Sequence, residues 1–278
     1  MSVVDDVFDA VAAIAPSIRA ALPGRREYID EANPSGEEVL AADRRADELL
    51  REAIGDIDGV GRYASEERET IDDVGSGLAV TCDPLDGSSN LESNNAMGTI
   101  VGLYDALLPA RGRDLVAAGY VLYGPITTMV TAVDGEVREW LVTDDGRREL
   151  REPTLPEKPV VYGFGGRRPD WPDAFEAYAS EIESELKLRY GGAMVGDVNQ
   201  VLTYGGVFSY PGLRSRSEGK LRLQFEGNPI AYVIEAGGGA SSDGDDSILD
   251  APATELHGRT PVHVGNRSLI DRLETHLS

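Results

Sequence analysis

Two amphipathic helices are predicted at the start of the chain. From residue 3 to residue 22, apolar side chains recur at spacings of three and four, the period of a helix with one buried face. An Asn-Pro-Ser-Gly break follows, and its Ser35 is a suitable N-cap for a second helix whose apolar face extends to Ile54. Glu37 falls in the first turn of this second helix. Asp43 lies near its apolar face, where an ion pair with a neighbouring arginine is the simplest role for that carboxylate.

The middle of the chain is rich in predicted strands. β-branched and aromatic residues gather there in short runs, a pattern typical of strands. The runs are Met97–Tyr104, Val116–Tyr123, Thr127–Val133 and Val137–Val142. Asp134-Gly135, between the last two runs, predicts a hairpin turn. Because these strands follow two helices, the first part of the chain is predicted to be a mixed α+β layer.

A proline-rich stretch is the best candidate for a domain boundary. Pro153, Pro156 and Pro159 stand among charged residues, so we divide the chain into an N-terminal α+β half of residues 1–155 and a C-terminal α/β half of residues 156–278. The elements expected in the second half are strands at 160–162 and 204–210 and helices at 173–186, 228–236 and 266–277, the last of them capped by Asn266.

One short motif carries most of the chemistry that the sequence suggests. Leu78-Ala79-Val80-Thr81-Cys82 predicts a buried strand that stops at a proline and delivers Asp83 to a turn. Asp83 and Asp86 can meet at one point across this turn and hold a hard cation such as Mg²⁺ or Mn²⁺. The following Gly87-Ser88-Ser89-Asn90 suits an anion at a helix start. Together these features suggest metal-assisted phosphoester chemistry, and the alternative is a capped structural turn.

The chain is strongly acidic. It has 26 basic and 49 acidic residues, which give a net charge of −23 and a pI near 4.4. Such a surface repels nucleic acids and anionic membranes, so neither is an expected partner. We interpret the composition as an adaptation to a salt-rich cytoplasm, because at molar salt the Debye length is only about 3 Å and self-repulsion is screened. An anionic substrate would therefore need a local group of cationic side chains.

Cysteine content and the N-terminal sequence favour a cytoplasmic location. Cys82 is the one cysteine of the sequence, so we expect no disulfide framework and no thiolate metal site. The N-terminal segment has acidic residues and lacks the basic region of a signal peptide. No apolar run approaches the length of a membrane span.

Several segments, taken together, make the sequence similar to one known family. They are residues 83–90, 97–104, 115–120 and 219–231, with shorter matches at 188–190, 194–195 and 204–206. From about Asn33 onward the chain resembles class I fructose-1,6-bisphosphatases, within the lithium-sensitive, Mg²⁺-dependent sugar phosphatase superfamily. The D-P-x-D-G-[ST] motif is shared with inositol monophosphatases, whereas G-K-L-R-L-x-[FY]-E-x-N-P is specific to the bisphosphatase branch. The resemblance implies an α+β and α/β layered fold with two mixed-sheet halves and flanking helices.

The resemblance also implies a catalytic set of carboxylates that binds two to three Mg²⁺ or Mn²⁺ ions. The residues that match metal ligands are Glu37, Glu66, Asp83, Asp86, Glu226 and, through its carbonyl, Leu85. Asp43 and Glu67 match the carboxylates that polarise the attacking water. Adjacent glutamates such as Glu66 and Glu67 are by themselves typical of a solvated turn. Their occurrence with the other acidic residues, in family order, favours the catalytic interpretation.

The implied reaction is hydrolysis of the 1-phosphate of fructose 1,6-bisphosphate, a gluconeogenic step. Bound metal ions would offset the charge of the phosphoryl oxygens and lower the pKa of the attacking water. The amides of Gly87, Ser88 and Ser89 would hold that phosphate. The residues that match the second phosphate site are Arg189, Tyr190, Tyr210 and Lys220. In the family the arginine reaches a neighbouring subunit, so the resemblance implies a homo-oligomer, a tetramer built of dimers.

The sequence departs from the family pattern in three ways. The family's Asn and Tyr near the 6-phosphate fall near Gly165 and Arg168, so Arg167 or Arg168 is expected to replace them. Most of the N-terminal segment that forms the family's AMP pocket is missing. The Lys, Tyr and Arg of that pocket fall at Gly77, Leu78 and Asp105, so we expect no inhibition by AMP.

Other functions stay open at this stage. The chain could be a phosphatase of the same superfamily that acts on sedoheptulose 1,7-bisphosphate or an inositol phosphate, or a sugar-phosphate-binding regulator without turnover. Paired cationic pockets favour a bisphosphate as substrate. The complete set of carboxylates favours an enzyme, because binding alone would not need it.

Overall fold

The computed structural model describes residues 2–25, 27–34, 36 and 38–278. Its N-terminal elements are α1 (Val3–Ala21), β1 (Tyr28–Ala32), β2 (Glu38–Leu40), α2 (Ala41–Gly55), β3 (Val60–Ser65), β4 (Asp72–Asp73), β5 (Leu78–Asp86), α3 (Asn90–Ser93), β6 (Met97–Tyr104), η1 (Gly112–Asp114), β7 (Leu115–Tyr123), β8 (Thr127–Val133), β9 (Glu136–Thr143) and β10 (Gly146–Arg151). The remaining elements are β11 (Val161–Phe164), η2 (Arg168–Asp170), α4 (Asp173–Glu185), β12 (Lys187–Leu188), α5 (Met194–Tyr204), β13 (Gly206–Tyr210), β14 (Leu221–Arg222), η3 (Leu223–Gly227), α6 (Asn228–Ala236), β15 (Ala240–Ser242), η4 (Ile248–Asp250), β16 (Arg259–Thr260), β17 (Val262–Gly265) and α7 (Arg267–Leu277).

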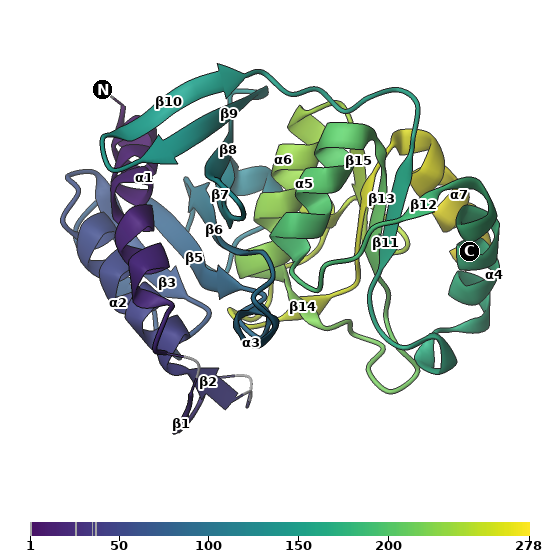
Figure 1. Cartoon of the computed structure of the whole chain (residues 1–278), viewed down its shortest axis with the longest axis horizontal. Helices are drawn as coiled ribbons and strands as arrows, with labels where there is room; N and C mark the ends of the chain where they lie inside the picture. Colours follow the sequence, from purple (N-terminus) through teal and green to yellow (C-terminus); the bar gives the residue numbers. More distant parts are fainter. Residues whose placement is uncertain (1, 26, 35, 37) are drawn as a thin grey trace.

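Helices and sheets alternate in five layers (Figure 1). The order of the eight-stranded sheet is β10-β9-β8-β7-β6-β5-β3-β4, and α1 and α2 cover one of its faces. Helices α5 and α6 fill the space between this sheet and a five-stranded sheet of order β12-β11-β13-β17-β15. Helices α4 and α7 cover the far face of the smaller sheet. Each sheet mixes parallel and antiparallel pairs, which confirms the predicted layered fold with two mixed sheets.

The apolar face that the periodicity predicts for the first helix packs against the protein core. Its residues Val7, Phe8, Val11, Ala15 and Ile18 are all buried, and they belong to the core between α1, α2 and the large sheet. Each large apolar side chain that is fully buried contributes about 1.5–3 kcal/mol to stability. The predicted strands 97–104 and 127–133 are confirmed with their bounds, and the hairpin turn after the second is confirmed by positive φ at Asp134 and Gly135.

The predicted start of the second helix is wrong. Helix α2 begins at Ala41, because residues 38–40 form β2 and pair with β1. Ser35 and Glu37, the predicted cap and first-turn residue, lie outside the described residues. Asp43 instead occupies the first turn of α2, where its carboxylate accepts a hydrogen bond from the backbone N–H of Leu40 at 2.9 Å.

Strand β5 does not stop at its proline, contrary to prediction. It continues through Pro84 to Asp86, and its pairing with β6 shifts register between Asp83 and Asp86. Such an irregularity accommodates a residue that has no N–H to donate to the ladder. Both aspartates therefore lie at the buried end of a central strand.

Four further features of the chain differ from the predictions. Helix α5 and strand β10 were not expected, and β13 begins at Gly206 because Tyr204 still belongs to α5. Asn266 does precede α7, but its side chain makes no capping bond. The side-chain oxygen of Asn266 accepts a hydrogen bond from the Gly206 N–H at 2.6 Å, and its side-chain nitrogen donates one to the Pro156 carbonyl at 2.8 Å.

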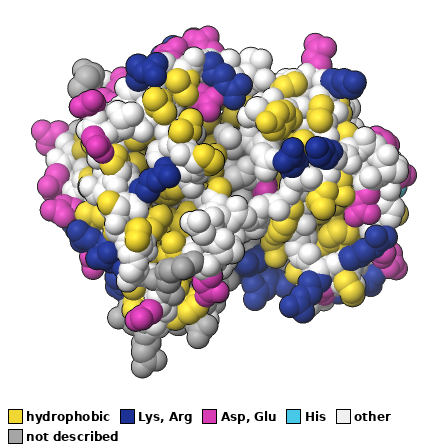
Figure 2. Space-filling view, in the orientation of Figure 1, with side chains coloured by type: hydrophobic (Ala, Val, Ile, Leu, Met, Phe, Trp, Pro, Cys, Tyr) yellow, Lys and Arg dark blue, Asp and Glu magenta, His cyan; other side chains and the backbone are white. Residues whose placement is uncertain are grey.

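The connection between the two sheets, residues 152–160, contains the prolines of the predicted boundary. The division of the chain into halves at residue 155 stays a prediction. Acidic and basic side chains are scattered over the face of the molecule in Figure 2. Within the described residues, no helix combines the length and the apolar composition needed to cross a membrane.

Candidate active site

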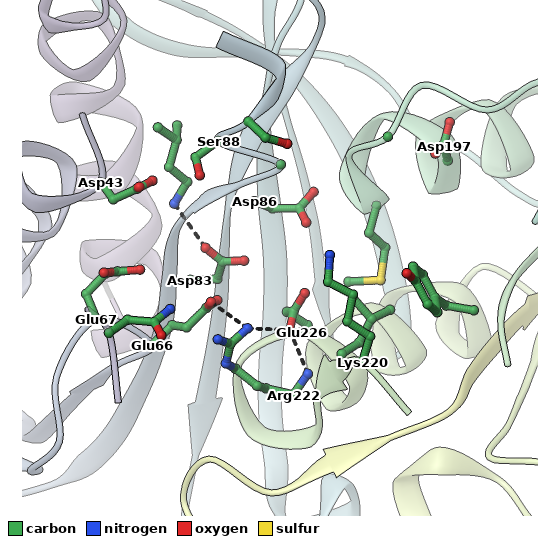
Figure 3. A pocket seen from close by; sticks show the side chains of 18 of the residues that line it. Asp43, Glu66, Glu67, Asp83, Asp86, Ser88, Asp197, Lys220, Arg222 and Glu226 are labelled. Carbon is green, nitrogen blue, oxygen red and sulfur yellow. Dashed lines mark hydrogen bonds and ion pairs between the residues drawn. The ribbon is translucent and has the colours of Figure 1, made fainter. Parts of the chain in front are cut away.

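A pocket of about 250 Å³ gathers most of the predicted site residues (Figure 3). It lies where the ends of β3 and β5 meet the π-helical turn η3 and the start of α5. The predicted residues that line it are Asp43, Glu66, Glu67, Asp83, Leu85, Asp86, Gly87, Ser88, Ser89, Tyr190, Tyr210, Lys220 and Glu226. Arg168 and Arg189 are not among its lining residues.

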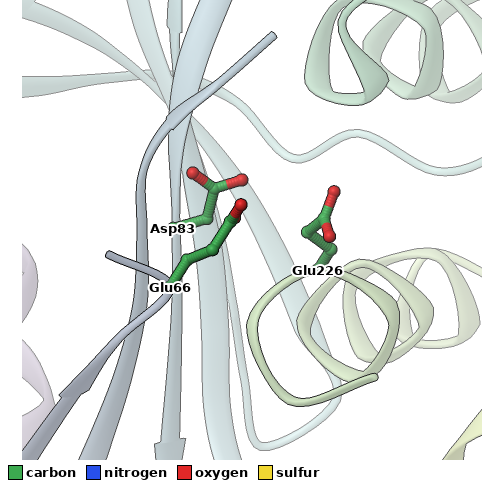
Figure 4. Close-up of side chains that lie close together, drawn as sticks. All are labelled: Glu66, Asp83 and Glu226. Carbon is green, nitrogen blue, oxygen red and sulfur yellow. The ribbon is translucent and has the colours of Figure 1, made fainter. Parts of the chain in front are cut away.

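Three carboxylates from distant parts of the sequence line the pocket and lie close together (Figure 4). Glu66, Asp83 and Glu226 are all buried, and each offers an oxygen such that these oxygens lie within 4.8 Å of one another. Burial and the nearby Glu66 carboxylate raise the pKa of Asp83 well above its usual value. Burial and Glu226 raise the pKa of Asp86 to about 8, and burial and Glu66 raise that of Glu226 to about 7. This cluster of like charges is destabilising in the absence of a cation.

Arg222 is the buried counter-charge of this cluster, and the sequence analysis did not single it out. Its guanidinium lies 2.7 Å from a carboxylate oxygen of Glu66, and its backbone N–H donates to Glu226 at 2.6 Å. The sequence did contain a sign of this role, because Arg222 is the arginine of the G-K-L-R-L segment that is specific to the bisphosphatase branch. One guanidinium does not balance four buried carboxylates, those of Glu66, Asp83, Asp86 and Glu226.

The donor set fits a hard divalent cation. Carboxylate oxygens are the ligands that Mg²⁺ and Mn²⁺ prefer, and no sulfur or imidazole is among the residues that form the cluster. The Leu85 N–H donates to Asp83 at 3.0 Å, and the Val195 N–H donates to Asp86 at 2.8 Å. These bonds orient the two aspartates and leave their other oxygens available for a metal ion.

A second acidic pair lies on the helix side of the pocket. The Asp43 carboxylate is hydrogen-bonded by the Leu40 N–H and by the Ser88 side chain, and burial raises its pKa to about 6. Burial and the Asp43 charge raise the pKa of Glu67 to about 7. The ion pair anticipated for Asp43 is found one turn later on α2, where the Asp47 carboxylate lies 2.8 Å from Arg68. Within the described residues, no arginine forms an ion pair with Asp43.

The phosphate-loop candidate, residues 87–89, connects β5 to α3. Helix α3 is a single turn of four residues. Gly87 has φ +74°, and a Cβ added there would lie 2.2 Å from the Ala193 Cβ, so only glycine fits this turn. The loop therefore packs tightly against the segment that precedes α5.

The opposite end of the pocket carries the predicted cationic and phenolic groups. The Lys220 ammonium lies 5.9 Å from the centre of the Tyr210 ring. Tyr190 lines the same end, and burial raises the pKa of its phenol to about 12. Asp197 of α5 also lines the pocket, and the sequence analysis missed it because no motif or predicted helix included it.

The two remaining predicted residues lie on the surface. Arg168 pairs with Glu176 at 3.0 Å and Glu183 at 3.5 Å on α4. Arg189 is exposed and directly follows the edge strand β12. Neither contributes to the pocket within this one chain, so their roles toward a second phosphate stay predictions.

Comparison with known proteins assigns both parts of the chain to one family. The family described as "Fructose-1-6-bisphosphatase, N-terminal domain" matches residues 7–151, and "Fructose-1-6-bisphosphatase, C-terminal domain" matches residues 155–278. A class 1 fructose-1,6-bisphosphatase of Natronomonas pharaonis is 60% identical over 278 residues, covering 99% of this chain and 98% of the relative. A class 1 enzyme of Halobacterium salinarum is 56% identical, covering 99% of this chain and 97% of the relative.

Solved structures agree with this assignment. The holo form of Leishmania major fructose-1,6-bisphosphatase superposes with a TM-score of 0.91 at 27% identity, covering 96% of this chain and 92% of that one. A putative sedoheptulose-1,7 bisphosphatase of Toxoplasma gondii superposes with a TM-score of 0.89 at 28% identity, covering 99% and 94%.

Proposed function

Because the chain belongs to the class 1 fructose-1,6-bisphosphatase family, we propose that it hydrolyses fructose 1,6-bisphosphate to fructose 6-phosphate and phosphate. The observation that carries this proposal is a 60% identical relative of that name that matches along nearly its whole length. The pocket is consistent with it, since its lining combines a carboxylate cluster with a lysine and two tyrosines. The gluconeogenic role and the cytoplasmic location belong to the same proposal.

The carboxylates have two proposed roles. Glu66, Asp83, Asp86, Glu226 and the Leu85 carbonyl hold two to three Mg²⁺ or Mn²⁺ ions, and Glu37 is proposed as a further ligand although it lies outside the described residues. When bound, such ions supply charge neutralisation of the phosphoryl oxygens and a more acidic water. The convergence of three buried acidic oxygens within 4.8 Å supports this assignment.

Asp43 and Glu67 are proposed to accept the proton of the attacking water. Their raised pKa values, about 6 and about 7, make them stronger bases than exposed carboxylates, and both line the pocket. The hydrogen bonds from the Leu40 N–H and the Ser88 side chain keep the Asp43 carboxylate directed toward the pocket. The loop of Gly87, Ser88 and Ser89 holds the 1-phosphate beside them.

The other end of the pocket is proposed to bind the sugar and its 6-phosphate. Lys220 supplies the positive charge, and the phenols of Tyr190 and Tyr210 supply hydrogen-bond donors. Arg168 and Arg189 remain candidates for additional phosphate contacts. Because Lys220 is exposed and does not hold the reacting phosphate, Lys220→Ala is expected to raise KM more than it lowers kcat.

We further propose that the protein is a homo-oligomer, a tetramer built of dimers, in which Arg189 reaches a neighbouring site. Arg189 follows β12, the edge of the smaller sheet, where Leu188 is 59% exposed. An unpaired strand edge presents backbone N–H and C=O groups with which another chain can pair. Light scattering coupled to size exclusion tests this, and a monomer with full activity would contradict it.

Phosphate release in high KCl with Mg²⁺ tests the proposed reaction. Fructose 1,6-bisphosphate, sedoheptulose 1,7-bisphosphate and inositol 1-phosphate are compared by kcat/KM, each with and without AMP. We expect preference for the fructose ester, no effect of AMP, and loss of turnover in Asp86→Ala. The similarity to the Toxoplasma gondii protein makes the sedoheptulose ester the second candidate. A preference for inositol 1-phosphate, or no turnover on any ester, would contradict the proposal.

A further inference from the structure

The carboxylate of Asp197 is buried at the edge of the pocket and is not used by the proposed chemistry. Asp197 is 2% exposed and lies in the first turn of α5. Its Oδ1 accepts a hydrogen bond from the Gly191 N–H at 2.6 Å. Its Oδ2 is buried and accepts no hydrogen bond of normal geometry within the described part of the chain, although the nearby Gly192 N–H also favours the charged carboxylate. A buried carboxylate with one free oxygen is costly to stability, so a functional reason for it is expected.

The carbonyl of the same residue, Gly191, is held by two side-chain amides. The Asn90 side chain donates to the Gly191 carbonyl at 2.8 Å, and the Asn95 side chain donates to it at 3.0 Å. Asn90 also donates to the Ala96 carbonyl at 2.7 Å, which fixes its own orientation. Both backbone polar groups of Gly191, which belong to two successive peptide bonds, are therefore bonded to side chains that come from different layers of the fold.

This arrangement joins the two ends of the pocket. Asn90 directly follows the phosphate loop of residues 87–89, and Gly191 directly follows Tyr190 at the sugar end. The junction is tight: a Cβ added at Gly192 would lie 3.1 Å from the Asn90 Oδ1. A shift of the sugar end relative to the phosphate loop would break at least one of these hydrogen bonds.

We propose that Asp197 is a positioning residue that, together with Asn90, fixes the backbone of Gly191 and thereby sets the spacing between the two phosphate-binding ends of the pocket. This inference rests on the proposed sugar-bisphosphate reaction. The spacing selects the length of the substrate, because a bisphosphate with one more carbon between its phosphates needs a wider separation. Asp197 thus acts on specificity through Tyr190, and not on the reacting phosphate.

Steady-state kinetics of Asp197→Leu and Asp197→Asn test the proposal with fructose 1,6-bisphosphate and sedoheptulose 1,7-bisphosphate. Leucine has a similar volume but leaves the Gly191 N–H without an acceptor. We expect Asp197→Leu to raise KM for the fructose ester about tenfold, as for loss of one hydrogen bond to a charged group. We expect kcat to change less than threefold, and the fructose-to-sedoheptulose ratio of kcat/KM to fall at least fivefold. Asparagine retains an acceptor oxygen, so Asp197→Asn should stay within threefold of the wild type.

Two further variants keep the test decisive. Asp271→Asn changes an exposed helical aspartate of α7 and should leave all constants unchanged. If Asp197→Leu does not fold, the exposed Asn95→Ala removes one bond to the Gly191 carbonyl and should raise KM two- to threefold with kcat unchanged. An unchanged substrate ratio in Asp197→Leu, or an unchanged KM in Asn95→Ala when the leucine variant does not fold, would overturn the positioning role. A wild-type protein inactive on fructose 1,6-bisphosphate would instead overturn the proposed function.

Discussion

Individual carboxylates in this protein are buried beside other carboxylates, where their charged form is unfavourable unless a cation lies close by. Asp83 is 5% exposed, and the charges of Glu66, Asp86 and Glu226 disfavour its ionised form. Such groups cluster where a protein binds a cation or performs acid and base chemistry. The cost is offset only in part by Arg222, the guanidinium in contact with Glu66.

Replacing one carboxylate of the cluster should therefore stabilise the metal-free protein. We expect Asp83→Asn to raise its melting temperature by a few degrees, at roughly 2–4 °C per kcal/mol for a chain of this size. The asparagine oxygen can still accept the Leu85 N–H. Mg²⁺ should raise the melting temperature of the wild type and not of the variant. Thermal scans with EDTA or Mg²⁺ measure both effects, with exposed Asp245→Asn as control; an equal Mg²⁺ shift in both proteins would contradict the metal assignment.

A buried histidine leads to a separate prediction about how the stability of the protein depends on pH. His263 of β17 is 1% exposed, and burial lowers its pKa to about 3, below the value of about 6.5 of an unfolded chain. The folded state then binds fewer protons, so this residue lowers stability as pH falls below 6.5, by about 1.4 kcal/mol per unit.

Comparison with His263→Leu isolates this contribution, because the carboxylates are common to both proteins. Between pH 7.5 and pH 5.5 the melting temperature of the wild type should fall by about 2–4 °C more than that of the variant. Differential scanning calorimetry at the two pH values measures the difference. A difference between the two proteins that does not change with pH would refute the prediction.

At the scale of elements, the site depends on how strands end. Strand β5 carries both aspartates because its register shift accommodates Pro84, and η3 brings Glu226 to the same point. Helix α5 starts where residues 190–193 pack on the phosphate loop. The pocket is thus built from element ends that only packing brings together.

The side chain of Asn266 is expected to stabilise the start of β13 at Gly206, although the two residues are far apart in the sequence. Asn266→Ala leaves the Gly206 N–H and the Pro156 carbonyl without these partners, so we expect a loss of about 1–3 kcal/mol in the free energy of unfolding. Urea denaturation measures this loss. Ser268→Ala, at an exposed position two residues later in α7, is the matched control and should change stability by less than 0.5 kcal/mol. Equal stability of both variants would contradict the role assigned to Asn266.

At the scale of the whole molecule, the net charge of −23 is the dominant property. The most similar proteins described above include enzymes of Natronomonas pharaonis and Halobacterium salinarum, which supports the interpretation of the acidic surface as a salt adaptation. Figure 2 shows acidic side chains dispersed over a face of the molecule and not gathered in one patch. Repulsion among these like charges destabilises the compact folded state as a whole.

Salt should accordingly stabilise the protein, because it screens the repulsion among these acidic side chains. We expect the melting temperature to rise between 0.2 M and 2 M KCl, because the Debye length falls from about 7 Å to about 2 Å. A variant in which exposed Glu136, Asp144, Asp145 and Glu149 are replaced by their amides should show a weaker dependence on KCl. Thermal scans across the salt series measure both slopes. Equal slopes would assign the effect to the general influence of salt on apolar burial.

Local patterns in the sequence predicted a large part of the fold. The helical spacing from residue 3, the strand runs from Met97 and the Asp134-Gly135 turn depend on neighbours within a few residues, and the structure confirms all three. Helix α5 was missed although its buried residues have helical spacing and Gly191-Gly192 precede it, because the residue at its start, Ala193, has no side chain that can cap a helix. The start of α2 was misplaced because β1 and β2 pair across a segment that local propensity reads as a helix start.

The sequence by itself determined the family, the acidic surface and the short motif of Asp83 and Asp86, because each is a property of composition or of residues close in the chain. The tertiary structure decided which distant groups meet. Glu226 lies beside Glu66 and Asp83, Arg222 serves as their counter-charge, and Asp197 holds Gly191 against Asn90 only because the two sheets and the helices between them pack as they do. Such contacts depend on burial and long-range geometry, which no local pattern encodes.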